Sequence, residues 1–189
     1  MLDTNQEKRK SLIFLTGFMG SGKSTIGPIL ANTLGYDYLD VDRFIEQKTK
    51  KEIVEIFRTE GEKAFRLVER ETLFELTKLN RSVISLGGGT IANEENCRIV
   101  SQHGILVYLK LSPEEIIQRV QYKNDRPMLR DTSGNLLKGE ELEKRITELL
   151  VLREPFYSRA DIIIHADNLR IGVTVDEIIK NIHGRIDES

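Results

Sequence analysis

Five short apolar stretches punctuate this chain, and longer stretches with apolar residues at helical spacing lie between them. Continuous apolar runs are typical of strands buried on both faces of a parallel sheet. The predicted strands cover residues 12–15, 36–41, 82–86, 105–111 and 162–164. Because strands alternate with helices along the chain, the pattern predicts an α/β domain with a parallel sheet and right-handed crossovers. Ligands of such a sheet are expected at the carboxyl ends of its strands.

The stretches between the strands carry the start and stop signals of helices. Gly35 follows the first predicted helix, Asn93 can cap a later one, and Pro113 stands at a first helical position. Pro155 is expected to break the longest of the later helices, because proline removes a helical hydrogen bond. The predicted helices cover residues 24–34, 43–79 in two or three pieces, 93–102, 113–122, 139–152 and 174–182.

The most specific motif follows the first predicted strand. Residues 17–24, GFMGSGKS, match the G-x-x-x-x-G-K-[ST] pattern of phosphate-binding loops. In that pattern the glycines let backbone N–H groups point at phosphate oxygens, and the N-terminus of the next helix adds partial positive charge. Lys23 would reach the β- and γ-phosphates, and the Ser24 hydroxyl would ligate Mg²⁺. The weaker alternative is a glycine-rich turn between a strand and a helix.

Two aspartates, Asp40 and Asp42, stand at the end of the second predicted strand. A strand would point them to opposite faces. One could then face Mg²⁺, and the other an acceptor hydroxyl, whose proton it could accept or whose attack it could orient. The alternative is a turn in which these residues cap the next helix.

The third predicted strand ends in three glycines, residues 87–89, where an NTPase motor would place an acidic residue. Support for Mg²⁺ must therefore come from elsewhere, and Asp40 is the candidate. Three glycines allow a bound molecule to approach the backbone closely. They are otherwise a flexible exit from the strand.

The chain has a net charge of −2, so it has no overall positive field to attract phosphates or other anions. Individual basic residues must therefore bind them, and three arginines are candidates. Arg66 and Arg153 could each bind a carboxylate with two parallel hydrogen bonds. Taken alone, each is more simply a solvated or surface-paired arginine, since Arg66 has Glu62 and Glu69 at helical contact spacing. Arg126 lies in a polar loop and could offset charge on a transferring phosphoryl group when that loop closes, or else it is an exposed loop arginine.

The bulk composition bounds the remaining possibilities. One domain is expected over residues 1–189, with residues 1–10 as a disordered tail and residues 123–138 as a lid. The slightly acidic charge and the absence of a basic run argue against nucleic-acid binding. A single cysteine, Cys97, fits a reducing compartment and is expected to pack in the core. No run is apolar enough for a membrane span and no signal peptide is present, so we expect a cytoplasmic protein.

The motifs taken together, in this order and spacing, strongly resemble those of shikimate kinases. They are GxxGxGKST, DVD, F-R-x-x-E, GGG, R-P-x-L and R-x-P-x-Y, and the likeness extends from about Leu12 to the last helix. The resemblance implies a three-layer α/β/α P-loop kinase fold with a five-stranded parallel sheet in the order 2-3-1-4-5, a lid and substrate-binding helices. It also implies transfer of the γ-phosphoryl group of ATP to the 3-hydroxyl of shikimate, on the route to chorismate and aromatic amino acids.

The resemblance assigns site residues by matched position. Those expected to bind ATP are Gly20, Ser21, Gly22, Lys23, Ser24, Thr25, Arg119 and Arg126. Those expected to bind shikimate are Asp42, Arg66, Gly88 and Arg153. One Mg²⁺ ion would be organised by Ser24 and Asp40, and the residues given catalytic roles are Lys23, Asp42 and Arg126.

Further positions match the family's supporting residues. Glu69 matches the residue that orients Arg66, and Phe57 and Phe65 match apolar walls of the shikimate pocket. Pro28, inside the helix after the phosphate-binding loop, departs from the family and should bend that helix. The segment 167–169 matches the adenine loop poorly, and no residue is assigned there.

Two other functions compete with this interpretation. Another small P-loop kinase, for gluconate or a nucleoside monophosphate, would lack the combination of D-x-D and F-R-x-x-E. A nucleotide-binding switch without transfer activity would need neither a lid arginine nor an acceptor-side aspartate. The expected partners are ATP and shikimate, with no nucleic acid and no membrane, and the chain is expected to be a monomer.

Overall fold

A computed structural model of the chain describes residues 10–121, 127–129 and 135–186. All five predicted strands are present, with small differences at their ends. The strands are β1 (Leu12–Thr16), β2 (Asp37–Asp40), β3 (Ser82–Ser85), β4 (Ile105–Lys110) and β5 (Ile162–His165). The helices are α1 (Lys23–Leu34), α2 (Val41–Thr49), α3 (Ile53–Thr59), α4 (Gly61–Leu76), α5 (Glu94–His103), α6 (Pro113–Val120), α7 (Gly139–Tyr157) and α8 (Ile171–Ile182), with a short 3₁₀ helix, η1 (Pro127–Leu129).

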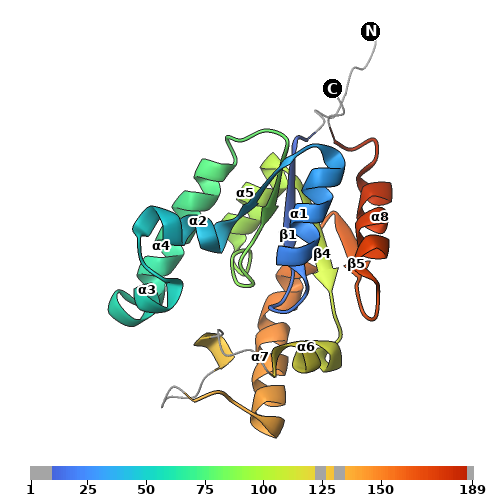
Figure 1. Cartoon of the computed structure of the whole chain (residues 1–189). Helices are drawn as coiled ribbons and strands as arrows, with labels where there is room; N and C mark the ends of the chain where they lie inside the picture. The colour runs from blue at the N-terminus through green and yellow to red at the C-terminus, as the bar shows by residue number, and fades with distance from the viewer. Residues whose placement is uncertain (1–9, 122–126, 130–134, 187–189) are drawn as a thin grey trace.

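The strands form one parallel sheet in the order β2-β3-β1-β4-β5, as the resemblance implied (Figure 1). In a parallel sheet all strands run the same way, so their carboxyl ends lie at the same end of the sheet. Three neighbouring strands therefore finish at this end of the sheet, at Thr16, Asp40 and Ser85, and Asp40 is directly opposite Ser85 in the register. The sequence motifs that follow these strands lie together there.

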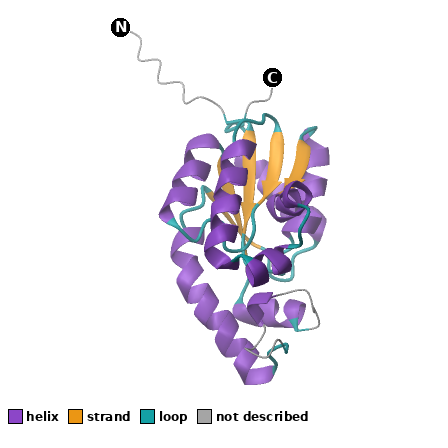
Figure 2. Ribbon diagram, turned by 90° about the vertical axis from the view of Figure 1, so that its left-hand side faces the viewer, coloured by secondary structure: helices purple, strands orange, loops and turns teal. Residues whose placement is uncertain are grey.

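Helices cover both faces of the sheet, so the fold has the expected three layers (Figure 2). Alternate residues of β1 belong to different cores: Phe14 packs with α2 to α5 and the end of α7, whereas Ile13 packs with α1 and α8. A third apolar cluster forms from Phe18 of the phosphate-binding loop with residues of α6, α7 and η1. Among the helices of the described ranges, none is long and apolar enough to cross a membrane.

Helix α7 is longer than the sequence pattern predicts. It passes through Pro155 and ends at Tyr157, so the expected break near Pro155 is wrong. Proline leaves the carbonyl four residues earlier without its helical partner. That residue is Val151, which is 68% exposed, so water can satisfy its carbonyl. Arg153 and Tyr157 consequently lie four residues apart on one continuous helix, on the same face.

Glycine 27 lies inside α1, where alanine would ordinarily favour the helix by up to about 1 kcal/mol. Here a Cβ would lie 2.3 Å from Cε2 of Tyr38, whose hydroxyl is held by a hydrogen bond to Ser85 (3.1 Å). We therefore expect Gly27→Ala to lower the free energy of unfolding by about 1–3 kcal/mol in urea titrations, because the helix must move off the sheet. Gly172→Ala in α8, where a Cβ meets no atom within 4 Å, is the matched control and should not destabilise. An equal effect of the two substitutions would contradict the steric argument.

Candidate active site

The phosphate-binding loop connects β1 to α1 in a conformation that requires glycine. Gly17, Gly20 and Gly22 have φ angles of 143°, 84° and 95°, which side-chain-bearing residues rarely adopt. At Gly17 a Cβ would also lie 2.6 Å from the carbonyl oxygen of Leu109. No side chain caps the N-terminus of α1, and its first turn contains no acidic residue. The loop therefore presents a helix N-terminus that suits an anion.

Lys23 folds back over this loop. Its ammonium donates hydrogen bonds to the carbonyl oxygens of Gly17 (2.8 Å) and Phe18 (3.2 Å), and it lies 3.4 Å from the hydroxyl of Ser21. Ser24 and Thr25 follow on the first turn of α1 and are exposed. The lysine charge and two hydroxyls thus lie together at the site that the motif predicts for phosphate.

Arg119 reaches the same loop from α6. Its guanidinium donates to the carbonyl of Gly20 (3.3 Å) and is paired with Glu115 (2.7 Å). A cation is therefore held beside the loop, where the sequence predicted an ATP-binding residue. Arg126 lies outside the described residues.

The two aspartates do not extend a strand. Strand β2 ends at Asp40, whose side chain accepts a hydrogen bond from the backbone N–H of Arg43 (3.2 Å) and caps α2, whereas Asp42 lies in the first turn of that helix. The expectation that strand alternation points them to opposite faces is therefore wrong, because helical capping sets their directions. Asp42 nonetheless lies against the glycines that follow β3: its Oδ1 is 2.8 Å from where a Cβ of Gly87 would stand.

The three glycines after β3 make room for three different polar side chains. The contacts that a Cβ would make there are Asp42 Oδ1 at Gly87 (2.8 Å), Arg153 Nη1 at Gly88 (3.4 Å) and Arg66 Nη2 at Gly89 (3.0 Å). The same position at Gly88 lies 3.6 Å from the carbonyl oxygen of Gly17. The glycine turn is thus the point at which the aspartate, both arginines and the phosphate-binding loop meet.

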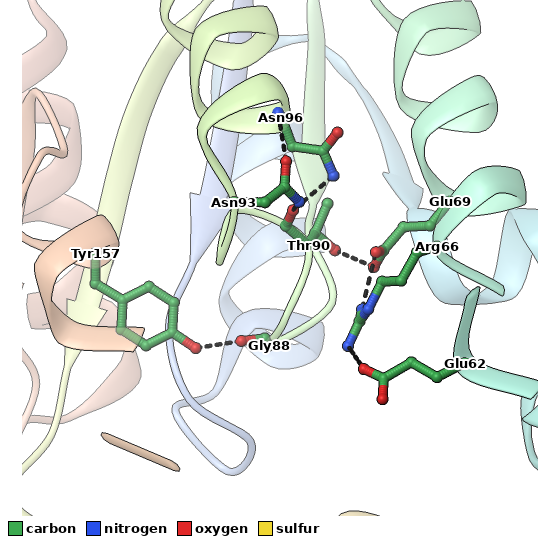
Figure 3. Close-up of polar contacts among 8 residues, drawn as sticks. All are labelled: Glu62, Arg66, Glu69, Gly88, Thr90, Asn93, Asn96 and Tyr157. Atoms are coloured by element: carbon green, nitrogen blue, oxygen red, sulfur yellow. Dashed lines mark hydrogen bonds and ion pairs between the residues drawn. The ribbon is translucent and has the colours of Figure 1, made fainter. Parts of the chain in front are cut away.

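Arg66 is held by carboxylates on its own helix, α4 (Figure 3). It donates to Glu69 (2.9 Å) and to Glu62 (3.1 Å), and the buried Glu69 also accepts from the hydroxyl of Thr90 (2.7 Å). Burial alone would lower the pKa of Arg66, but the two carboxylates outweigh it and raise this pKa above its usual value. The pairing anticipated from helical spacing is present, and the guanidinium also faces Gly89.

Arg153 differs from Arg66 in its surroundings. It is only 6% exposed, and among the ion pairs of the described residues none includes it. Its guanidinium lies 5.4 Å from the centre of the Phe18 ring. A buried charge without a counter-charge is costly, and an anionic ligand would lower that cost. The alternative of a solvated surface arginine is therefore excluded for Arg153.

Tyr157 fixes the middle of the glycine turn from α7 (Figure 3). Its hydroxyl donates to the carbonyl oxygen of Gly88, and its ring packs against that of Tyr108, with centroids 4.9 Å apart. Burial raises the pKa of Tyr157 to about 12, so the hydroxyl stays protonated and remains a donor near neutral pH.

An open cleft of about 1030 Å³ lies between α4 and α7. Arg66, Gly89 and Arg153 line it together with apolar side chains that include Leu67 and Phe156. Asp42 and the phosphate-binding loop contact the glycine turn next to this cleft. The lining also includes the basic residues Lys63 and Arg70 and the acidic residues Glu62, Glu94 and Glu95. Arg66 and Arg153 beside apolar side chains suit a small organic anion at the end of the cleft next to the glycine turn.

The aromatic pair expected to wall the pocket lies next to Arg66 and is not among the residues that line the cleft. The rings of Phe57 and Phe65 are 4.7 Å apart, and the Arg66 guanidinium is 5.3 Å from the centre of the Phe65 ring. Phe65 is buried and Phe57 partly buried in the core, so the Phe65 ring connects Arg66 to the core. Cys97 is also buried, as expected, and contacts the carbonyl of Ile91 (3.2 Å).

Sequence reasoning missed three residues that touch the site's side chains. Phe18 occupies a position that the phosphate-loop motif leaves unspecified, Thr90 follows the glycines, and Tyr157 ends the R-x-P-x-Y motif without an assigned role. The role of each of these residues depends on a contact between segments that are distant in the sequence. Only Tyr157 could have been identified from the sequence, because it lies one helical turn after Arg153.

Residues 19–183 match the family model described as Shikimate kinase. The chain is 48% identical over 179 residues to shikimate kinase of Chlorobaculum tepidum, covering 95% of this chain and 94% of the relative. It is 50% identical over 175 residues to shikimate kinase of Chlorobium limicola, covering 93% of this chain and 88% of the relative. The solved structure of shikimate kinase from Acinetobacter baumannii in complex with shikimate aligns with a TM-score of 0.83 at 35% identity, covering 92% and 93% of the two chains. The motifs, the sheet order and these matches agree, and the chain belongs to the shikimate kinase family.

Proposed function

We propose that this chain transfers the γ-phosphoryl group of ATP to the 3-hydroxyl of shikimate at the glycine turn, giving shikimate 3-phosphate and ADP. The observation that carries the proposal is the buried Arg153, which has no carboxylate partner among the described residues and lies beside Gly88. Shikimate carries one carboxylate and three hydroxyls, which two arginines and an aspartate would complement. The relative of known structure from Acinetobacter baumannii was solved with shikimate, which supports the choice of acceptor.

On the nucleotide side, the phosphates of ATP would bind across the loop and the first turn of α1. The residues proposed to hold them are Gly20, Ser21, Gly22, Lys23, Ser24 and Thr25. Arg119, which lies beside the loop, would contact the nucleotide from α6. Arg126, outside the described residues, is proposed to stabilise the transferring phosphoryl group.

On the acceptor side, Arg66, which lies at Gly89, and Arg153, which lies at Gly88, would hold the carboxylate of shikimate. Asp42 would hold the hydroxyls and either accept the proton of the attacking oxygen or orient that oxygen towards the γ-phosphorus. Glu69 would keep Arg66 in place, since it pairs with Arg66 at 2.9 Å. Because phosphoryl transfer depends mainly on positioning and charge, this arrangement supplies what the reaction requires.

The residues near α1 fit one Mg²⁺ ion. Asp40 is opposite Ser85, whose hydroxyl lies 3.4 Å from the carbonyl oxygen of Lys23, the residue before Ser24. The Asp40 carboxylate also interacts with the Tyr38 hydroxyl, which is hydrogen-bonded to Ser85, so one carboxylate and one hydroxyl are close to the start of α1. In the described part of the chain no group of three or more candidate metal ligands is present, which suits an ion held mainly by phosphates and water. We propose that Ser24 and Asp40 hold it, where the ion would neutralise phosphate charge.

The proposal extends to the surroundings of the enzyme. The single cysteine, buried in the core, supports the expected reducing compartment, and we propose a cytoplasmic monomer. The net charge of −2 favours small-molecule partners over nucleic acid.

An ADP-release assay with a panel of acceptors tests the proposed function. Shikimate should give ADP at a rate well above the rate without acceptor, and gluconate and nucleoside monophosphates should not. ADP release with one of the other acceptors and none with shikimate would contradict the proposal.

Arg66→Lys is expected to raise the KM for shikimate by about tenfold, because an ammonium cannot form the two parallel hydrogen bonds of a guanidinium. The KM for ATP should change little. Steady-state kinetics with each substrate varied in turn provide the measurement. Arg58→Lys is the matched control, because Arg58 is exposed on the neighbouring helix α3 and does not line the cleft. An unchanged KM for shikimate in the Arg66 variant would remove Arg66 from the site.

A further inference from the structure

Phe18 is an apolar side chain in the middle of the phosphate-binding loop. It is 2% exposed, although the motif places no constraint on its position. Its ring packs in the apolar cluster formed with α6, α7 and η1, which includes Ile146 and Leu149 of α7. Part of its role is therefore to join the loop to α7.

The ring also faces a charge. The Arg153 guanidinium carbon lies 5.4 Å from the ring centre, within the distance for a cation–π interaction. Such interactions are stronger when the cation is removed from water, and Arg153 is 6% exposed. No carboxylate of the described residues pairs with Arg153. The partners that offset its charge in the absence of ligand are the Phe18 ring on one side and the Tyr157 hydroxyl, which is hydrogen-bonded to the guanidinium.

The loop that carries Phe18 is itself fixed. Its glycine conformations leave little freedom, and the N–H of Ser21 donates to the carbonyl oxygen of Phe18 (3.1 Å). The ring consequently has a defined place, with Gly88 and Arg153 next to the loop. A flexible side chain such as arginine keeps one geometry only when its surroundings determine that geometry.

We propose that Phe18 is a positioning residue for Arg153, holding the guanidinium beside Gly88 so that it is preset for the carboxylate of the acceptor. This inference rests on the proposed function and deepens it. It assigns to the phosphate-binding loop a second role, in acceptor recognition, that is carried by a side chain rather than by its backbone N–H groups.

The test compares Phe18→Leu with Phe14→Leu. Both replace a buried phenylalanine, but Phe14 packs in the core on one face of the sheet and is in none of the cation–π contacts of the described residues. Phe18→Leu should raise the KM for shikimate by roughly 5- to 30-fold. The KM for ATP should stay within about twofold, because the backbone N–H groups of the loop remain. Phe14→Leu should leave the KM for shikimate unchanged while losing comparable thermal stability.

A neutral acceptor separates positioning from general damage. The methyl ester of shikimate offers no carboxylate charge to Arg153, so kcat/KM for the ester should be nearly equal in the wild type and in Phe18→Leu. Phe18→Met, with a flexible apolar side chain of similar size, repeats the test if the leucine variant folds poorly.

The outcomes are distinguishable. An equal loss of kcat/KM for acid and ester, or an unchanged KM for shikimate, would overturn the positioning role while leaving the proposed function intact. Absence of shikimate-dependent ADP release in the wild type would instead overturn the proposed function.

Discussion

Replacement of Asp42 by asparagine is expected to lower kcat by about 100-fold or more and to leave ATP binding nearly native. The reason is geometric. Asp42 lies in the first turn of α2 with its carboxylate against the glycine turn, where we propose that the acceptor binds. Asparagine has the same shape but can neither accept a proton nor draw the acceptor hydroxyl towards the γ-phosphorus with a negative charge.

Turnover at saturating substrates, together with ATP binding measured by titration, tests this expectation. Asp37→Asn is the control, because Asp37 begins the same strand, β2, and is exposed at its far end. The control should retain native kcat. Near-native turnover in Asp42→Asn would show that this carboxylate is neither base nor orienting group.

Arg153→Met should raise the KM for shikimate by about 100-fold, because the acceptor carboxylate loses two charge-assisted hydrogen bonds. The same change should not lower the free energy of unfolding and is expected to raise it. Arg153 is a buried cation without a carboxylate partner among the described residues, so an apolar side chain of similar length removes a desolvation cost. Loss of binding combined with retained or increased stability is the signature of a residue kept for its ligand.

The measurements are steady-state kinetics and chemical denaturation without ligand. Arg159→Met, two residues past the end of α7, is the control: Arg159 is exposed and paired with Glu94 (2.7 Å). Its replacement should leave the KM for shikimate unchanged. A marked loss of stability in Arg153→Met with a native KM would assign Arg153 to the fold and not to the acceptor.

Much of the fold could be predicted because its signals are local. Runs such as that of β1, continuously apolar and followed by a glycine-rich loop, determine both strand type and position. The two features of the fold that differ from the prediction also have local causes. Pro155 does not end α7, since Val151, whose carbonyl it leaves without a partner, faces water. Asp40 ends β2 by capping α2, a role that the sequence pattern allowed but did not favour.

The sequence was enough to predict which residues belong to the site, but it predicted fewer of the contacts that those residues make. Lys23, Arg66 and Arg153 could be chosen from motifs, because each motif needs its residue for a chemical reason. Arg66 pairs with two carboxylates of its own helix, as their helical spacing indicated, whereas Arg153 is buried against Phe18 of a separate segment. No sequence period reports the contact between Arg153 and Phe18, since it arises only when the phosphate-binding loop and α7 come together in the fold.

Identification of the product tests the central claim most directly. Incubation of the enzyme with Mg²⁺, ATP and shikimate, followed by ³¹P NMR and mass spectrometry, should give one shikimate monophosphate, esterified at the 3-hydroxyl, for each ADP formed. ADP accompanied by inorganic phosphate and unmodified shikimate would contradict the claim that this site delivers the phosphoryl group to shikimate.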